Sequence, residues 1–239
     1  MTRTIGILGG MGPEATLNLF DQVIRLTQAD TDQENVPVLI WNNPSIPDRT
    51  SAILHGGPSP LPKLIEGARI LEKGGADMIL MPCVTAHYFY HEIIKHISIP
   101  FLHLLDTARL YIEEHLPAAR RLGVIATKGT FGSNLFHDIF IRDGKELVIP
   151  DDRHMQLFMD AVYSEEGLKV GYKEKPKQKL LQIVHHLAER GADAIIGGCS
   201  EIPLVLSSRD MTLPFIDPLK LLAAEGIKRA GFPVSCELN

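Results

Sequence analysis

Short apolar segments rich in β-branched residues alternate along this chain with longer segments whose apolar residues recur at helical spacing. Strands that alternate with amphipathic helices are typical of a parallel sheet with helical crossover connections. The pattern therefore predicts an α/β protein, with helices in most of the intervals between strands. The expected strands are residues 4–8, 36–41, 77–81, 99–103, 122–126, 146–149, 193–197 and 213–216.

The chain also repeats one of its own segments. Residues 71–83 (LEKGGADMILMPC) align without a gap to residues 187–199 (LAERGADAIIGGC), at an offset of 116 positions. The similarity continues beyond the cysteines, because residues 97–101 resemble residues 211–215. Such an internal duplication predicts two pseudo-symmetric α/β domains, each with a mostly parallel sheet flanked by helices.

The repeat also suggests where the two domains divide. The first is expected at residues 1–103, completed by a C-terminal helix within 213–239, and the second, its internal duplicate, at 104–212. Cys83 and Cys199 then follow equivalent strands, at the position where open α/β sheets bind ligands. Two such domains that face each other would bring both thiols into an inter-domain cleft, which is the expected active site.

A cysteine at the start of a helix is expected to hold a thiolate more readily than a free thiol, whose pKa is about 8.5. Thr85 and Ser200 are the candidate helix caps beside the two cysteines, and Pro203 fits a first helical turn. One thiolate and one thiol on opposite faces of a carbon acid form a base and an acid. The first removes the α-proton and the second returns one from the other side, which inverts the carbon without a redox partner or a metal ion.

Composition narrows the choice of partner and compartment. The 239 residues carry a net charge of −5 without a basic stripe, so a small molecule is expected as ligand rather than nucleic acid or a membrane surface. No apolar run approaches the roughly 18 residues of a spanning helix. Three cysteines are too few for a disulfide scaffold, which indicates a reducing, cytoplasmic setting. Cys236, in an irregular tail, is interpreted as incidental.

Five sequence blocks occur in an order that resembles a known family. They are residues 7–16 (ILGGMGPEAT), 42–50 (NNPSIPDRT), 82–87 (PCVTAH), 166–171 (EGLKVG) and 198–203 (GCSEIP). Together they resemble the aspartate racemase branch of the aspartate/glutamate/hydantoin racemase superfamily, over nearly the whole chain. Any one block is weak evidence for the family. Five blocks in the right order, together with the duplicated halves, are strong evidence.

This resemblance implies a two-domain fold, a homodimer, and a reaction without pyridoxal phosphate, any other cofactor or a metal ion. It assigns the acid–base pair to Cys83 and Cys199, in agreement with the argument from the residues. It also places Arg49 and Lys169 against the acidic groups of the substrate. Aspartate carries two carboxylates, and an arginine fork can hold one of them while a lysine supplies a point charge.

Further substrate contacts are expected in the loops after the first strand of each half and beside the two cysteines. The loop at residues 9–12 is interpreted as a backbone anion nest, and residues 126–130 occupy the equivalent place in the second half. A tight turn capped by a hydroxyl is the alternative for both loops. The expected contacts are Met11, Gly12, Thr16, Val84, Thr85, Thr127, Thr130, Ser200 and Glu201.

The chain departs from the family pattern beside each cysteine. The family usually has Cys-Asn-Thr at the first, whereas this chain has Val84 in place of the asparagine. At the second, Ser200 replaces a threonine and keeps a hydroxyl. Val84 removes an amide that would reach the carboxylate or amine of the substrate, which puts the preferred substrate in question.

The sequence therefore predicts a cofactor-independent amino-acid racemase that acts on aspartate or a close relative. The alternatives are a racemase of another amino acid, such as glutamate, or one of broad specificity, a hydantoin racemase, and a non-catalytic amino-acid-binding homologue. A decarboxylase needs a single cysteine acid, so the second thiol counts against it.

Two other interpretations of these motifs are weaker. A zinc site formed by Cys83, His87 and Cys199 would need a fourth ligand that the sequence does not single out. A dinucleotide-binding loop at residues 9–12 lacks the full G-x-G-x-x-G spacing and is followed by Pro13.

Overall fold

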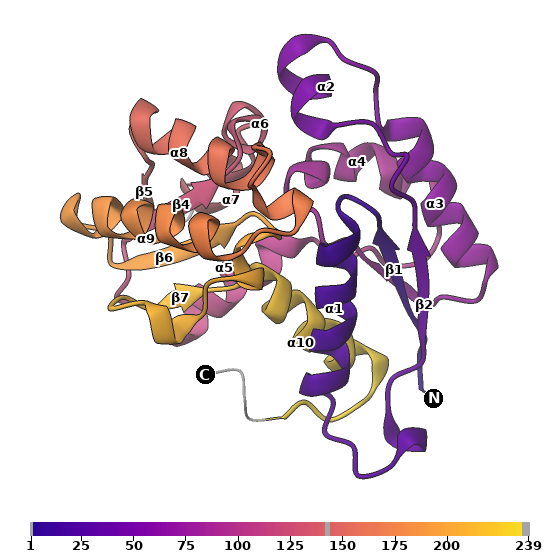
Figure 1. Ribbon diagram of the computed structural model, residues 1–239. Coiled ribbons are helices and arrows are strands. Elements are labelled where there is room, and N and C mark those ends of the chain that lie inside the picture. The colour runs from indigo at the N-terminus through magenta and orange to yellow at the C-terminus, as the bar shows by residue number, and fades with distance from the viewer. Residues whose placement is uncertain (1, 142–143, 236–239) are drawn as a thin grey trace. The chain divides into compact units, whose positions relative to one another are not determined.

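The computed structural model describes residues 2–141 and 144–235 (Figure 1). The chain forms two compact units, one from Met1–Thr107 with Leu219–Asn239 and the other from Ala108–Pro218. From the repeat in the sequence, these divisions were expected at residues 103 and 212. Each unit contains one parallel sheet with helices around it, which confirms the predicted α/β class. Within the described ranges, no helix is long and apolar enough to cross a membrane.

The first unit is built on a three-stranded parallel sheet in the order β2-β1-β3. Figure 1 shows α1 and α10 on one side of this sheet and α3 on the other. The elements of this unit are β1 (Ile5–Gly9), α1 (Pro13–Leu26), η1 (Asp32–Glu34), β2 (Val38–Asn42), α2 (Arg49–His55), α3 (Leu61–Lys73), β3 (Met78–Leu80), η2 (Thr85–Phe89), α4 (Tyr90–Ile93), η3 (Ile94–His96), the start of α5 (Leu104–His115) and α10 (Pro218–Ala230).

Alternation along the strands explains why helices cover both faces of the first sheet. Every residue of β1 is buried, so its side chains pack alternately against the two helical layers. On one face, a Cβ at Gly67 in α3 would lie 2.6 Å from Leu8 Cδ1, so glycine lets the helix approach the sheet closely. On the other face, Gly226 in α10 allows the same close approach to Leu80 and Ile5.

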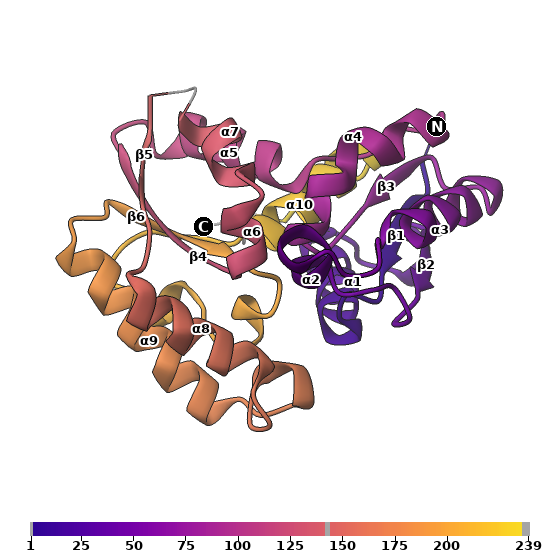
Figure 2. The same ribbon diagram turned by 90° about the horizontal axis from the view of Figure 1, so that it is seen from above.

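The second unit is built on a four-stranded parallel sheet in the order β5-β4-β6-β7. Figure 2 shows α8 and α9 side by side over one face of this sheet and α7 on the opposite side. The elements of this unit are the rest of α5, β4 (Arg121–Ala126), α6 (Lys128–Gly132), α7 (Leu135–Phe140), β5 (Glu146–Val148), α8 (Asp152–Tyr163), η5 (Leu168–Val170), α9 (Glu174–Glu189), β6 (Ala194–Gly198), η6 (Ile202–Leu204), η7 (Ser208–Asp210) and β7 (Phe215–Ile216).

The order β2-β1-β3 of the first sheet matches the order β5-β4-β6 of the second, and similar hydrogen bonds begin the central strands β1 and β4. In the first unit the Asp77 carboxylate accepts a hydrogen bond of 2.7 Å from the backbone N–H of Thr4, just before β1. In the second, the Asp193 carboxylate accepts bonds of 2.9 and 2.8 Å from the N–H groups of Arg120 and Arg121 at the start of β4. Equivalent aspartates of the repeat thus fix equivalent strand ends.

One predicted strand is wrong. Residues 99–103 make a single bridge, between Phe101 and Ile79 of β3, instead of a strand. Two backbone bonds hold it, in which Ile79 N–H donates to Pro100 C=O and Leu102 N–H donates to Ile79 C=O. Pro100 has no N–H to extend the ladder and α5 begins at Leu104, so pairing ends after one residue.

Each sheet has a topological switch point, where successive connections leave toward opposite faces. It lies between β1 and β3 in the first unit and between β4 and β6 in the second. Ligands of open α/β sheets bind outside the carboxyl ends of the strands at such a point. Cys83 follows β3 and Cys199 follows β6, so each cysteine lies at the switch point of its own unit.

Candidate active site

The segment around Cys83 differs in one respect from the sequence expectation. The residue is buried, but a 3₁₀ helix, η2, follows it rather than an α-helix. Val84 rather than Thr85 is the N-cap, and its side chain makes no capping bond, so the expected cap by Thr85 is wrong. Short 3₁₀ turns align few peptide dipoles, which weakens the argument that a helix terminus stabilises a thiolate at this position.

His87 fixes the backbone that carries Cys83. Its Nε2 accepts a bond of 3.2 Å from the Leu104 N–H, so Nδ1 carries the proton and donates to Cys83 C=O over 2.9 Å. Burial, and to a smaller extent His103, lower the pKa of His87 to about 3, and the ring is neutral. Because both ring nitrogens bond to backbone, the zinc interpretation that used His87 is disfavoured.

The segment around Cys199 brings the thiol against a carboxylate. Cys199 follows β6 directly and is buried, and its Sγ donates to Glu201 Oε2 over 3.0 Å. The next element is the 3₁₀ helix η6, which has a proline in its first turn, as expected for Pro203. Ser200 does not cap this helix. Its hydroxyl donates to the same Glu201 oxygen over 3.1 Å.

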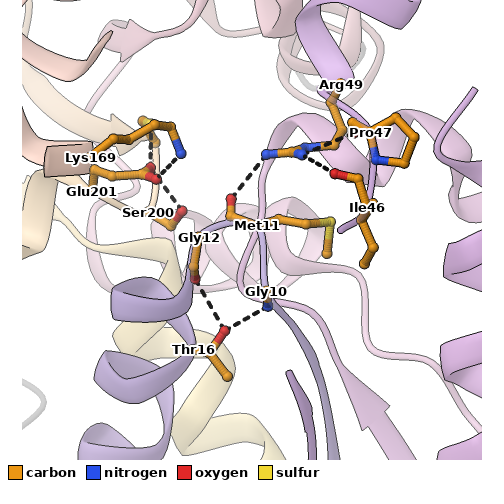
Figure 3. A network of polar contacts seen from close by, with 11 residues as sticks. Gly10, Met11, Gly12, Thr16, Ile46, Pro47, Arg49, Lys169, Ser200 and Glu201 are labelled. Carbon is orange, nitrogen blue, oxygen red and sulfur yellow. Dashed lines mark hydrogen bonds and ion pairs between the residues drawn. The ribbon is translucent and has the colours of Figure 1, made fainter. Parts of the chain in front are cut away.

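Glu201 is the centre of a buried polar network in the second unit (Figure 3). Its Oε1 accepts from Lys169 Nζ over 2.7 Å, while its Oε2 receives the Cys199 and Ser200 hydrogens. Burial alone would raise the pKa of Glu201, but the Lys169 ammonium and these three hydrogen bonds outweigh it, so the pKa lies below its usual value. Glu201 is therefore a carboxylate at neutral pH.

The proton of Cys199 is held in place rather than released. Burial, the negative charge of Glu201 and the hydrogen bond to it raise the pKa of the Cys199 thiol well above its ordinary value, although Lys169 acts in the opposite direction. The expectation of a thiolate stabilised by a helix start is therefore wrong at this position. The surroundings favour a thiol that can give a proton.

Lys169 lies on η5, in the stretch that follows α8. Only 27% of its side chain is exposed, and its Nζ lies 5.5 Å from the centroid of the Tyr163 ring. An ammonium at this distance from an aromatic face gains a cation–π attraction. Lys169 is thus held between Glu201 and Tyr163, and no sequence motif pointed to Tyr163.

The glycine-rich loop after β1 is anchored by one hydroxyl (Figure 3). Thr16 Oγ1 accepts from the Gly10 N–H over 2.9 Å and donates to Gly12 C=O over 3.1 Å. Gly10 has φ +102°, and a Cβ there would collide with the backbone of Asn43. The loop conformation therefore requires glycine, and Thr16 holds the loop from the first turn of α1.

Arg49 is buried at the start of α2 and makes three bonds to backbone carbonyls (Figure 3). One guanidinium nitrogen donates to Pro47 C=O over 3.0 Å and to Ile46 C=O over 3.4 Å, and the other donates to Met11 C=O over 3.2 Å. The guanidinium thus joins the glycine-rich loop to the residues before α2. Asp48 caps this helix by accepting from the Ser51 N–H.

The equivalent loop of the second unit is a capped turn. Thr127 Oγ1 accepts from the Thr130 N–H over 3.1 Å and lies 3.0 Å from Thr130 Oγ1. Thr127 is the N-cap of the short helix α6, and both threonines are buried. The hydroxyl-capped turn that was the alternative interpretation is therefore present at this loop. Cys236 lies outside the described residues.

Comparison with known proteins agrees with this arrangement. Residues 8–226 match the family model of the Asp/Glu/Hydantoin racemases. The broad specificity amino-acid racemase RacX of Bacillus subtilis is 30% identical over 223 residues, which is 92% of this chain and 94% of the relative.

Solved structures show the same fold. An aspartate racemase from Picrophilus torridus superposes with a TM-score of 0.89 at 28% identity, over 98% of this chain and 97% of that one. A glutamate racemase from Francisella tularensis, solved with D-glutamate, shares the fold with a TM-score of 0.66 at 14% identity, over 95% and 80% of the two chains. The chain therefore belongs to the Asp/Glu/hydantoin racemase family and is an amino-acid racemase, an isomerase.

Proposed function

We propose that the protein racemises aspartate without a cofactor, by proton transfer between the thiols of Cys83 and Cys199. The observation that carries this proposal is the hydrogen bond from Cys199 Sγ to the Glu201 carboxylate. A buried thiol whose proton is held by a carboxylate is suited to act as a general acid. Cys83, after the equivalent strand of the first unit, supplies the partner group.

The reaction consists of two proton transfers on opposite faces of the substrate. The Cys83 thiolate takes the α-proton, and the electron pair of the broken C–H bond is delocalised into the adjacent carboxylate. The Cys199 thiol then gives its proton to the opposite face of Cα, which inverts the centre. Cys83 ends as a thiol and Cys199 as a thiolate, so charge and protons balance.

The opposite enantiomer requires the two roles to be exchanged. The forward reaction leaves Cys83 as a thiol and Cys199 as a thiolate, which is the state that the opposite enantiomer requires. Glu201 Oε2 accepts the Cys199 hydrogen and so orients the thiol for proton donation, and the Lys169 ammonium beside Glu201 offsets the negative charge that moves onto the sulfur. Glu201 is thus proposed as a positioning residue for the Cys199 proton, in addition to the substrate contact expected from the sequence.

Two observations support aspartate as the substrate. Arg49 and Lys169 are the two cations that the resemblance places against acidic groups, and both are at least partly buried, where a charge-assisted bond is strong. In addition, the aspartate racemase from Picrophilus torridus superposes over nearly the whole chain.

A racemase of broad specificity is the second candidate. Val84 is a buried apolar residue beside Cys83, and the Arg49 guanidinium already bonds to three backbone carbonyls. Both features reduce the polar groups available for a side-chain carboxylate. The relative from Bacillus subtilis is itself described as a broad specificity racemase.

Solvent deuterium incorporation tests the reaction and the substrate together. Purified protein is incubated in D₂O with L- and D-aspartate, glutamate, alanine and a hydantoin, and deuterium at Cα is measured by NMR beside the enantiomer ratio. We expect both exchange and racemisation, with the highest kcat/KM for aspartate. Comparable kcat/KM values for aspartate and alanine would favour broad specificity, and absence of exchange with every compound would contradict a racemase.

Replacement of Arg49 separates a substrate contact from a structural one. If Arg49 holds the side-chain carboxylate, Arg49→Ala lowers kcat/KM for aspartate by an amount equivalent to about 2–4 kcal/mol of transition-state stabilisation and leaves kcat/KM for alanine nearly unchanged. Arg49→Lys should recover only part of this loss, because the fork geometry is gone. If the guanidinium serves only its backbone carbonyls, both substrates lose activity equally. Urea unfolding of the variant shows how much of any loss comes from stability.

A further inference from the structure

Three potential metal ligands converge where α8 meets α9, in a part of the second unit that shares no residue with the site described above. Asp151 is the N-cap of α8, His154 is in the first turn of that helix, and His186 projects from α9. His154 Nδ1 lies 2.7 Å from Asp151 Oδ1, and His186 Nε2 lies 3.6 Å from Asp151 Oδ2. All three ligand atoms lie within 4.8 Å of one another.

We propose that Asp151, His154 and His186 bind one divalent transition-metal ion, of which Zn²⁺ is the best match. Two imidazole nitrogens and one carboxylate oxygen are the donor set that Zn²⁺ takes in proteins, with a water molecule in the fourth position. Alkaline-earth ions prefer a shell made only of oxygen, so this donor set selects against Mg²⁺ and Ca²⁺.

The His186 nitrogen that faces the triad has one backbone partner. Nε2 of His186 accepts a bond of 3.4 Å from the Asp151 N–H, and a metal ion would have to replace this bond. The bond is longer than the roughly 3 Å typical of such hydrogen bonds, so its replacement costs little.

Binding needs only a local rearrangement. The two imidazole rings are stacked, with centroids 3.8 Å apart and an interplanar angle of 12°. Because a metal ion lies in the plane of each ligand ring, one ring must turn about its Cβ–Cγ bond, a torsion with a broad energy minimum. The ion would then replace the hydrogen between His154 and Asp151, and the donors would settle about 2.0–2.2 Å from it.

The site would fasten α8 to α9. Asp151 and His154 come from the start of α8, and His186 comes from the last turn of α9. Side-chain exposures of 49%, 18% and 16% for Asp151, His154 and His186 leave an entry path from solvent. The sequence signal is weak, since an Asp-x-x-His spacing on one helix face becomes informative only when a third ligand from another element is known to be near.

Metal-binding measurements on matched variants test the proposal. Equilibrium dialysis against Zn²⁺ is carried out on the wild-type chain and on His154→Gln, His186→Gln and Asp151→Ser, the last of which keeps a hydroxyl to cap α8. We expect the wild type to bind one equivalent more than each variant, or to bind it at least tenfold more tightly. His185→Gln, beside the triad on α9, is the matched control and should bind like the wild type.

Co²⁺ distinguishes this site from the catalytic thiols, which could also bind Zn²⁺. Thiolate ligands give an intense near-ultraviolet charge-transfer band with Co²⁺, whereas a site of nitrogen and oxygen ligands does not. For the wild-type chain with Co²⁺ we expect visible d–d absorption without the thiolate charge-transfer band. The His186→Gln variant should lose this d–d absorption. Equal stoichiometry and affinity in all variants, or Co²⁺ spectra with only thiolate character, would overturn the proposal.

Discussion

Cys83 and Cys199 follow equivalent strands of a duplicated unit, yet the residues beside them differ. Two positions after Cys199 stands Glu201, which holds the thiol proton, whereas two positions after Cys83 stands Thr85. The position after Cys199 is Ser200, which also donates to that carboxylate, whereas Cys83 is followed by apolar Val84. The repeat thus retained the strands and thiols, while the residues that control the protons diverged.

The two halves also fix their cysteines by different means. In the first, the His87 imidazole bonds to Cys83 C=O and to the first N–H of α5. In the second, the equivalent position of the repeat is Pro203, which pre-sets the backbone of η6. A neutral side-chain bridge and a proline therefore do the same task. The charged network of Glu201 and Lys169 belongs to the Cys199 half.

The largest effect is expected when one half loses its thiol. Cys83→Ala and Cys199→Ala should each lower racemisation by about 10³-fold or more, because one of two acid–base groups is missing. Each variant keeps the other thiol of the pair, so residual deuterium exchange should be confined to one enantiomer, and to opposite enantiomers in the two variants. Either variant with wild-type activity at wild-type stability would exclude the two-thiol mechanism.

A smaller effect is expected when the charged network is removed from the Cys199 half. Glu201→Gln keeps the size and hydrogen bonding but takes away the charge that raises the Cys199 pKa, so that pKa should fall. Since Cys199 must be protonated to act as the acid, the basic limb of kcat/KM should move to lower pH and the maximum should fall about 10- to 100-fold.

Thr85→Ala is the matched change in the Cys83 half. It should leave the position of that basic limb unchanged, because Thr85 carries no charge. The comparison is made by measuring kcat/KM against pH for Glu201→Gln and Thr85→Ala with the same substrate. A basic limb that stays in place in Glu201→Gln would show that Cys199 is not the group that titrates there.

Restoring an amide beside Cys83 tests the other difference between the halves. If Val84 leaves a polar group of aspartate unpaired, at a cost of about 1–3 kcal/mol, Val84→Asn should raise kcat/KM for aspartate roughly tenfold. If the pocket suits a different substrate, the same change lowers activity on that substrate. A panel of amino acids distinguishes these results, and no change on any substrate would show that Val84 does not face the ligand.

The smallest effect concerns the aspartates that begin the two sheets. Asp77 accepts one backbone bond and Asp193 accepts two, so Asp193→Asn should lose more stability than Asp77→Asn, by about 0.5–1 kcal/mol given their exposure. Urea unfolding at pH 7 measures this difference. Equal losses in the two variants would mean that the second bond of Asp193 contributes nothing.

The pH dependence of that stability has a definite sign. The bonds from Arg121 and Arg120 lower the pKa of Asp193 below 3.8 in the folded protein. A pKa that is lower in the folded state than in the unfolded state stabilises the folded protein at pH values above the unfolded-state pKa. This contribution is lost as the pH falls through the folded-state pKa. The Asp193→Asn variant should therefore approach wild-type stability as the pH is lowered from 7 toward 3.

The sequence by itself determined the α/β class and pointed to the two cysteines as the candidate chemical centre. Both follow from local information, because hydrophobic periodicity specifies strands and helices, and the aligned repeat places each cysteine after an equivalent strand. The family blocks also pointed to Arg49, Lys169 and Glu201. What each of these side chains contacts was not available from the pattern.

Only the tertiary structure decided how the protons and charges are held. Glu201 and Lys169 form a hydrogen bond although they are 32 positions apart in the sequence, and Arg49 and Met11 do so at a separation of 38 positions. Neither contact therefore leaves a local sequence pattern. The structure also turned a predicted fourth strand into the single bridge at Phe101. The local hydrophobic pattern indicates which side of a helix or strand is buried. The pKa of a buried thiol depends instead on charged groups that the fold brings near it.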